Sequence, residues 1–327
     1  MHNRTKQASG FTIIELLVVI AIIATLTAVL TVGGKKIRIA GKGLQQKAVF
    51  HAMTVGLELF SSDFNGYPAS RLTTGANGAA PYVTGAQHLA EALLGRDGRG
   101  FEPMTGWYPP NDKLYRPNAP ADLYDTQVAN SQSLARRKGP YCELKYGYAV
   151  SIYALWKGNN GSSQIYDSGA NPASVQRSPV ITDVFNKVEV ALPNGELVRA
   201  GMPILYFKSN PSARFRVDAA RQEVKNPAAA EYTQWVYNYN DNLPALQLPW
   251  LSDAVASEAD KRGISQHYYD PAKPANSAAQ NFYETITQPG GDASRGFFKP
   301  YNADTFLLIS AGNDGIFGTK DDIVNFD

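Results

Sequence analysis

The chain has 327 residues and a formal net charge of +2, with 44% hydrophobic and 18% charged residues. This composition supports a packed core and excludes a wholly disordered protein. The single cysteine, Cys142, excludes both an internal disulfide framework and a cysteine-rich zinc site.

The charge is distributed unevenly along the chain. Residues 1–57 contain seven Lys or Arg residues and a single acid, Glu15. Residues 58–327 contain 24 basic and 28 acidic residues, a balance of −4. Because a general nucleic-acid footprint requires a basic surface, we expect no specific nucleic acid binding.

Residues 11–32 form an apolar run in which only Glu15 can ionise. About 20 apolar residues in a helix span about 30 Å, the thickness of the hydrocarbon core of a bilayer. A secretory signal peptide is the alternative, since Arg4 and Lys6 precede the run. Its apolar region should be only about 7–15 residues long and end at a small-residue cleavage site. We therefore predict a transmembrane helix over residues 11–33.

Glu15 is costly in this position, because a lone carboxylate is disfavoured in a membrane. One interpretation is a protonated side chain close to the lipid headgroups. The other is an ion pair with a dedicated cation. No basic residue lies within helical reach inside the run, so that cation must come from another chain or from a new terminus.

The segment from Gly10 to Ala24 reads GFTIIELLVVIAIIA and closely resembles the signal of type IV prepilins and type II secretion pseudopilins. The resemblance implies that residues 1–10 are a leader peptide, which a membrane prepilin peptidase cuts between Gly10 and Phe11. The same enzyme then N-methylates the new amino terminus at Phe11. Glu15 corresponds to the signature acid of the family, and the Phe11 amine of one subunit would neutralise Glu15 of its neighbour.

The resemblance also implies a single-pass protein of the bacterial inner membrane with its head in the periplasm, or at the cell surface within an assembled filament. The basic residues that follow the apolar run are Lys35, Lys36, Arg38, Lys42 and Lys47. They outnumber those before it, and the positive-inside rule alone would favour the opposite orientation. Long domains translocate largely regardless of flanking charge, so we follow the family orientation. The implied partners are other pilin-like subunits, the prepilin peptidase, a platform protein and an assembly ATPase.

Residues 34–65 predict an amphipathic continuation of the helix. Its apolar stripe recurs at three- and four-residue steps: Ile37, Ala40, Leu44, Ala48, Ala52, Val55 and Leu59. The sequence Asn65-Gly66-Tyr67-Pro68 predicts the end of the helix near Phe64, with glycine to end it and proline to prevent its continuation.

Residues 66–327 predict a large pilin-like head. A helix is expected over Ala86–Leu94, and strands are expected over Tyr146–Trp156, Pro179–Glu189, Pro203–Lys208 and Thr305–Ser310. Asn194-Gly195 is a hairpin signal. Residues 219–300 read as a long, weakly patterned insertion. The fold class is α+β, with the long N-terminal helix packed on an antiparallel sheet.

Two short segments of the head resemble a passage of major pseudopilins, Asp-Pro-Trp-Gly-x-Pro-Tyr, that precedes their sheet. Asp183-Val184-Phe185 is similar to its first half, and Met202-Pro203-Ile204-Leu205-Tyr206 is similar to its second half. An inserted hairpin would separate the two halves.

Residues 310–323, SAGNDGIFGTKDDI, form an acidic, glycine-rich loop near the C-terminus. Calcium takes about 6–8 oxygen ligands, and the spacing here does not fit an EF-hand. The loop resembles the calcium loop of major pseudopilins, which implies a structural calcium ion bound by Asp314, Asp321 and Asp322. The alternative is a pair of tight turns, since Asp-Gly is common turn chemistry.

No nucleophile elbow, zinc-protease helix or phosphate loop occurs in the sequence, and we predict no enzymatic activity. We expect His267 to be an exposed loop residue and Cys142 to be a small buried hydrophobe. The favoured function is a structural subunit of a pilus or of a type II secretion pseudopilus. The alternatives are a minor or tip subunit whose head binds a ligand, exoprotein, DNA or surface, and a membrane-tethered enzyme.

Overall fold

A computed structural model describes most of the chain. The described residues are 12–74, 82–105, 123–127, 129–144, 149–156, 165, 179–192, 195–213, 236–248, 251, 267–288 and 299–326, without the side chains of 28–33 and 35. The expected leader and the cleavage site between Gly10 and Phe11 lie outside this part. The chain divides into two units, Met1–Leu44 and Gln45–Asp327, which are treated separately below.

Helix α1 (Ile13–Phe64) is continuous through the glycine-rich stretch that follows the apolar run. In the first unit, the hydroxyls of Thr25 and Thr27 bond back to helix carbonyls, as expected for polar groups in an apolar helix. Among the described residues, no helix contains an apolar stretch long enough to count as a candidate membrane span.

The end of α1 lies at the predicted residue. Asn65 takes the left-handed conformation with φ 55°, and the N–H of Gly66 donates to the carbonyl of Ser61 over 3.1 Å. This pairing satisfies a free carbonyl of the last helical turn, as in other left-handed caps. The residue that reverses the chain is therefore Asn65 rather than the expected glycine.

The buried face of α1 in the second unit differs from the predicted stripe. The helix buries Val49, Phe50, Met53, Leu57 and Phe60. Val55 and Leu59, which we expected in the stripe, are 47% and 51% exposed. Both sets recur at three- and four-residue steps, so periodicity could not choose between two apolar faces. The apolar stripe read from the sequence was therefore the wrong face, although a helix over these residues was confirmed.

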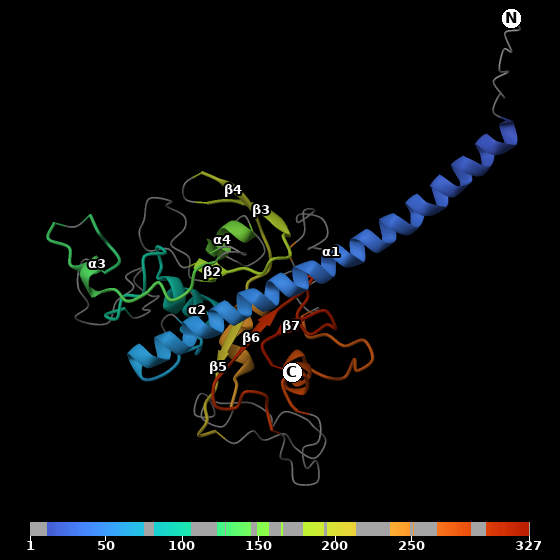
Figure 1. Ribbon diagram of the computed structural model, residues 1–327. Helices are drawn as coiled ribbons and strands as arrows, with labels where there is room; N and C mark the ends of the chain where they lie inside the picture. Colours follow the sequence, from blue (N-terminus) through green and yellow to red (C-terminus); the bar gives the residue numbers. More distant parts are fainter. Residues whose placement is uncertain are drawn as a thin grey trace, which may run out of the picture. The chain divides into compact units, whose positions relative to one another are not determined.

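A three-stranded antiparallel sheet lies at the centre of the second unit, in the order β5 (Leu205–Lys208), β6 (Phe306–Ser310), β7 (Ile323–Val324) (Figure 1). Tyr206 pairs with Leu308, and Ile309 pairs with Val324. Alternate residues serve two cores. Tyr206 and Leu308 pack in one core with α1, whereas Phe207 belongs to the core on the other side.

Helix α2 (Gly85–Leu94) confirms the predicted head helix and packs in the same core as α1. Its N-terminus is capped because Gln87 Oε1 accepts from the N–H of Thr84 over 2.8 Å. A Cβ at Gly85 would lie 2.3 Å from the carbonyl oxygen of Tyr206, so only glycine allows α2 to approach β5 this closely.

Two of the predicted strands are interrupted earlier than expected, and residues 146–148 of the first lie outside the described part of the chain. Strand β1 (Ala149–Ser151) gives way to the helical turn α4 (Ile152–Leu155), because the Ser151 hydroxyl caps the turn by accepting from the N–H of Ala154. The Pro179–Glu189 segment divides into β2 (Pro179–Ile181), paired with β1, and the start of β3 (Val188–Ala191). Both single-strand predictions were therefore wrong in extent.

The predicted hairpin is present, since β3 pairs antiparallel with β4 (Leu197–Ala200). It separates the two segments that resemble a single pseudopilin passage. The N–H of Asp183 donates to the carbonyl of Met202 over 2.8 Å, and Thr182 forms a bridge with Pro203. The two halves thus lie side by side across the base of the hairpin.

The remaining described elements are short helices. They are α3 (Ser133–Arg136), η6 (Tyr239–Asn242), α5 (Leu243–Leu246) and α7 (Ala278–Thr285). Three of them fall in the segment we expected to be weakly patterned. Helix α7 begins with a capping box in which Ser277 accepts from the N–H of Gln280 over 3.2 Å. The Ser-x-x-Gln spacing was a usable signal for that helix.

Candidate functional site

The first turn of α1 places Glu15 on Thr12, in a capping arrangement that we did not predict. Glu15 Oε2 accepts from both the N–H and the hydroxyl of Thr12 over 2.8 Å, and Thr12 Oγ1 accepts from the N–H of Glu15 over 3.2 Å. The Thr-x-x-Glu spacing, a capping box, was the available signal. Both side chains are exposed in the single chain.

The acidic C-terminal loop brings its three predicted ligands into one compact turn. Asp314 donates its N–H to Asp321 Oδ2 over 2.9 Å, and Gly318 donates its N–H to Asp322 Oδ2 over 2.7 Å. The Thr319 hydroxyl donates to Asp321 Oδ1 over 2.6 Å. The carboxylates therefore accept mostly from the N–H groups of their own turn, which folds them close together.

The electrostatics of the turn are those of crowded acids. Burial, with smaller contributions from the negative charges of Asp314 and Asp321, raises the pKa of Asp322 to about 8, against the opposing effect of the N–H of Gly318. Burial also raises the pKa of Asp314 to about 6. Burial alone would do the same at Asp321, but the hydrogen bonds from Thr319 and from the N–H of Asp314 lower its pKa below the usual range. Asp321 is thus the best-stabilised carboxylate of the three.

No cation of the described chain neutralises these acids. None of the described ion pairs involves Asp314, Asp321 or Asp322, and Asp322 Oδ1 is buried without a hydrogen-bond partner. Lys187 donates to the carbonyl oxygen of Asn313 rather than to a carboxylate. In the described residues, no group of three or more His, Cys, Asp or Glu side chains is already arranged as a metal site.

The acidic turn is hydrogen-bonded to His267 through the N–H of Phe317. We wrongly expected His267 to be an exposed loop residue. The side chain is 4% exposed. Its Nδ1 accepts from the N–H of Phe317 over 3.1 Å, and its Nε2 lies 3.0 Å from the carbonyl of Leu248. This pattern assigns the neutral ring with its proton on Nε2. Burial lowers the pKa of His267 to about 4. The burial depends on contacts far along the chain, which a local pattern does not reveal.

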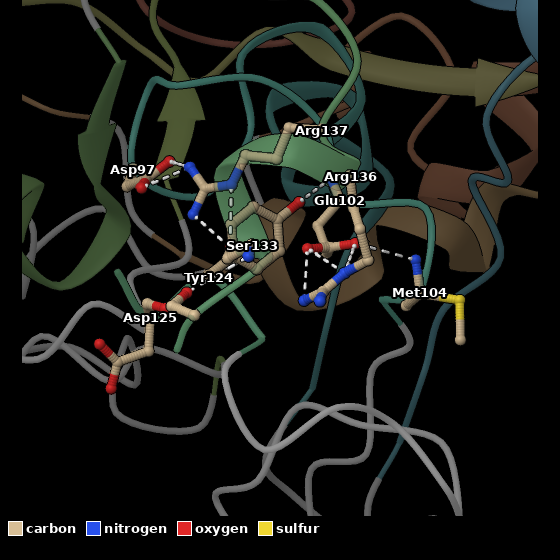
Figure 2. Close-up of polar contacts among 9 residues, drawn as sticks. Asp97, Glu102, Met104, Tyr124, Asp125, Ser133, Arg136 and Arg137 are labelled. Atoms are coloured by element: carbon tan, nitrogen blue, oxygen red, sulfur yellow. Dashed lines mark hydrogen bonds and ion pairs between the residues drawn. The ribbon is translucent and has the colours of Figure 1, made fainter. Parts of the chain in front are cut away.

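A second polar cluster, built on α2, α3 and the segments beside them, was also not predicted. It contains three ion pairs: Glu91–Arg96 at 2.7 Å, Asp97–Arg137 at 2.6 Å and Glu102–Arg136 at 3.1 Å. We call these six residues the charged cluster. Figure 2 shows the two outer pairs, with Arg136 against Glu102 and Arg137 against Asp97. Each acid has its own arginine, so the charged cluster is internally neutral.

Tyr124 contacts three residues of the charged cluster. The guanidinium carbon of Arg96 lies 5.1 Å from its ring centroid and that of Arg137 lies 4.9 Å from it. The Tyr124 hydroxyl accepts from the N–H of Glu102 over 3.0 Å. Cation–π contacts of this kind strengthen when they are desolvated, and Tyr124 is only 1% exposed. The arrangement has the properties of a structural core and leaves none of its acids without a cation.

The described nucleophilic and basic side chains show no catalytic arrangement. His51, His88 and His267 lie on separate elements. Cys142 is buried, as expected, and burial raises its thiol pKa to about 11, which disfavours the reactive thiolate.

Comparison with known proteins identifies the N-terminal segment. A family model described as the prokaryotic N-terminal methylation motif matches residues 5–31, which include Gly10, Phe11 and Glu15. The segment is thus of the kind that prepilin peptidase processes. Residues 5–31 thus resemble the N-terminal segment of type IV pilin-like and pseudopilin-like proteins, and the long helix with small antiparallel sheets is consistent with their α+β arrangement. No curated protein and no solved structure matches the chain.

Proposed function

We propose that this chain is a structural subunit of a type IV pilus or of a type II secretion pseudopilus. The observation that carries the proposal is the methylation motif over residues 5–31. Residues 1–10 would be removed, residues 11–33 would span the inner membrane before assembly, and the head would lie in the periplasm. Other pilin-like subunits, prepilin peptidase, a platform protein and an assembly ATPase are the proposed partners. The chain itself would catalyse no reaction.

Mass spectrometry of the mature N-terminus tests the processing step. Co-expression with prepilin peptidase should give a chain that begins with N-methylated Phe11. A Gly10→Val variant, which alters only the residue before the cut, should keep the leader. A wild-type chain that retains its first ten residues in the presence of the peptidase would remove the basis of the proposal.

Glu15 is the proposed assembly residue. Its carboxylate is exposed and bonded only to Thr12 in the described chain, so it is accessible to the Phe11 amine of a neighbouring subunit. Glu15→Ala should leave membrane insertion intact and abolish incorporation into filaments. Asp63→Ala, which removes another exposed acid of α1, is the control and should still assemble. Normal assembly of Glu15→Ala would contradict this role.

We also propose a structural calcium ion at the acidic turn, with Asp314, Asp321 and Asp322 as side-chain ligands. The residues fit the ion, because they offer hard oxygen donors, no cation of the described chain neutralises them, and Asp322 Oδ1 lacks a partner. A Cβ at Gly312 would lie 2.1 Å from the Asp321 carbonyl, so the chain folds tightly at this point. Calcium would supply the positive charge that the turn lacks.

A thermal melt with and without chelator tests the calcium proposal. Calcium should raise the melting temperature of the full-length protein in detergent, and magnesium at the same concentration should raise it less, because Mg²⁺ requires a smaller octahedral site and dehydrates reluctantly. Asp314→Ala should remove the response. A wild-type melting curve that calcium does not change would reject the ion.

The second candidate function is a minor or tip subunit. The observation that favours it is the size of the unit Gln45–Asp327, together with its charged cluster, which lies outside the region of the methylation motif. Copy number in purified filaments separates the two. A major subunit should be present along the whole filament, whereas a tip subunit should be present in only a few copies.

A further inference from the structure

Two buried oxygen atoms beside the acidic turn have no hydrogen-bond partner in the described part of the chain. One is Asp322 Oδ1 and the other is the hydroxyl of Tyr268, a side chain that is only 1% exposed. Buried polar groups are nearly always paired, because an unpaired group loses its hydrogen bonds to water without replacement. Each of the two atoms is therefore suited to take up a further polar partner.

Gly318 lies between the Asp322 carboxylate and the ring of Tyr268. The N–H of Gly318 donates to Asp322 Oδ2 over 2.7 Å, which fixes one side of the carboxylate. On the other side, a Cβ at Gly318 would lie 2.7 Å from both Cα and Cδ1 of Tyr268, so the Tyr268 ring packs directly on the glycine. Gly318 has φ +90°, which favours glycine in any case.

The Tyr268 ring is held in place by several contacts. Its N–H donates to the carbonyl of Phe317 over 2.6 Å, and its carbonyl accepts from the side chain of Asn281 over 2.6 Å. The ring meets Phe282 edge-on, with the centroids 5.4 Å apart. The hydroxyl therefore cannot turn away to solvent without breaking this packing.

We propose that Tyr268 is a positioning residue of a divalent-cation site at the acidic turn, with its hydroxyl hydrogen-bonded to the Asp322 carboxylate when the cation is bound. The inference rests on the calcium ion proposed above. It adds a residue from the segment 267–288, outside the sequence similarity that suggested the ion. Carboxylates that bind metals are usually held by an outer hydrogen bond, and an oxygen with two lone pairs can serve both partners.

This role predicts that Tyr268→Phe, which removes only the hydroxyl, has different effects in chelator and in calcium. In chelator, the variant should melt at or above the wild-type temperature, because an unpaired buried hydroxyl has been removed. With calcium, it should respond less, and its apparent dissociation constant for calcium should rise about tenfold, the lower end for outer-shell residues. Calorimetric titration of the full-length protein in detergent with calcium alone measures this change.

Tyr206→Phe is the matched control. Tyr206 is equally buried, but its hydroxyl donates to the carbonyl of Pro68 over 2.8 Å. This variant should lower the melting temperature by the same amount with and without calcium, and its calcium affinity should equal that of the wild type.

The outcomes separate this inference from the calcium proposal. No calcium response in the wild type would reject the ion and the inference together. A normal wild-type response with unchanged affinity in Tyr268→Phe would reject only the role of Tyr268. Equal destabilisation of Tyr268→Phe in chelator and in calcium would assign the hydroxyl to a cation-independent partner, such as a buried water, and would also overturn the inference.

Discussion

The charged cluster and the acidic turn stabilise their acidic side chains in different ways. Each contains three acids in or near the protein interior. In the charged cluster every acid has an arginine, so that Glu91, Asp97 and Glu102 form ion pairs of 2.6 to 3.1 Å. The acids of the acidic turn accept hydrogen bonds mostly from N–H groups of their own turn and have no described ion pair. A site that supplies its own counter-charge is structural, whereas one that lacks it is suited to bind a cation.

The largest effect is expected when one charge is removed from the innermost ion pair of the charged cluster, Glu91–Arg96. Arg96 and Glu91 are 0% and 3% exposed, and Arg96→Met should lower the free energy of unfolding by about 3–5 kcal/mol, because a buried charge is left alone. Urea denaturation measures the loss. The double variant Glu91→Met with Arg96→Met should recover most of it. A small effect of the single variant would mean that the cluster admits water.

The part of the protein beside the acidic turn should instead lose stability when His267, which is neutral in the folded protein, becomes protonated. His267 has a pKa of about 4 in the folded protein, against 6.5 in the unfolded chain. Its contribution is therefore complete above about pH 6.5 and is lost as the pH falls towards 4, with a total of about 3 kcal/mol. The measurement is the pH dependence of the unfolding free energy in chelator.

His267→Gln is the control for this pH dependence. Glutamine can still accept and donate hydrogen bonds but does not titrate, so the variant should lose this part of the slope. Asp183 contributes the opposite slope, because burial raises its pKa to about 7 and its stabilisation is lost as the pH rises from 3.8 to 7. The wild-type and variant curves must therefore be subtracted. Parallel curves would contradict the role of His267.

Replacing one aspartate by asparagine in the acidic turn and one in the charged cluster tests the comparison further. Asp322→Asn should not destabilise the protein in chelator at neutral pH, because it keeps an acceptor for the N–H of Gly318 and a neutral side chain where the pKa of Asp322 is about 8. It should remove the calcium response, which amounts to about 2.7 kcal/mol at a hundredfold excess over the dissociation constant. Asp97→Asn should destabilise the protein equally in both conditions. Melting curves of the two variants with and without calcium measure these effects. The same response to calcium in both variants would contradict the distinction between the acidic turn and the charged cluster.

The smallest effect is expected at the rim of the charged cluster. Arg137 donates two bonds to Asp97, whose side chain is 17% exposed. Arg137→Lys keeps the charge but loses the planar fork and the bonds to Ser133, at a cost of about 1 kcal/mol. Chemical denaturation resolves a change of this size. A neutral result would show that charge alone matters here.

Local patterns in the sequence determined several features of this protein. The ordered motif from Gly10 to Glu15 identified the N-terminus, since a costly acid at a fixed distance after a glycine, inside an apolar run, rarely arises by chance. The Asn-Gly-Tyr-Pro segment located the end of α1, and β-branched and aromatic runs located β5 and β6. These features depend on near neighbours along the chain.

Only the tertiary structure decided which groups meet. Helix α1 is apolar on two faces, and the packing in the second unit buries Met53 and Leu57 rather than Val55 and Leu59. His267 is buried because Leu248 and Phe317 approach it from distant segments, and Tyr268 meets Gly318 for the same reason. Spacing along a chain does not encode such encounters. They arise when separate elements pack in three dimensions and leave specific polar atoms either paired or alone.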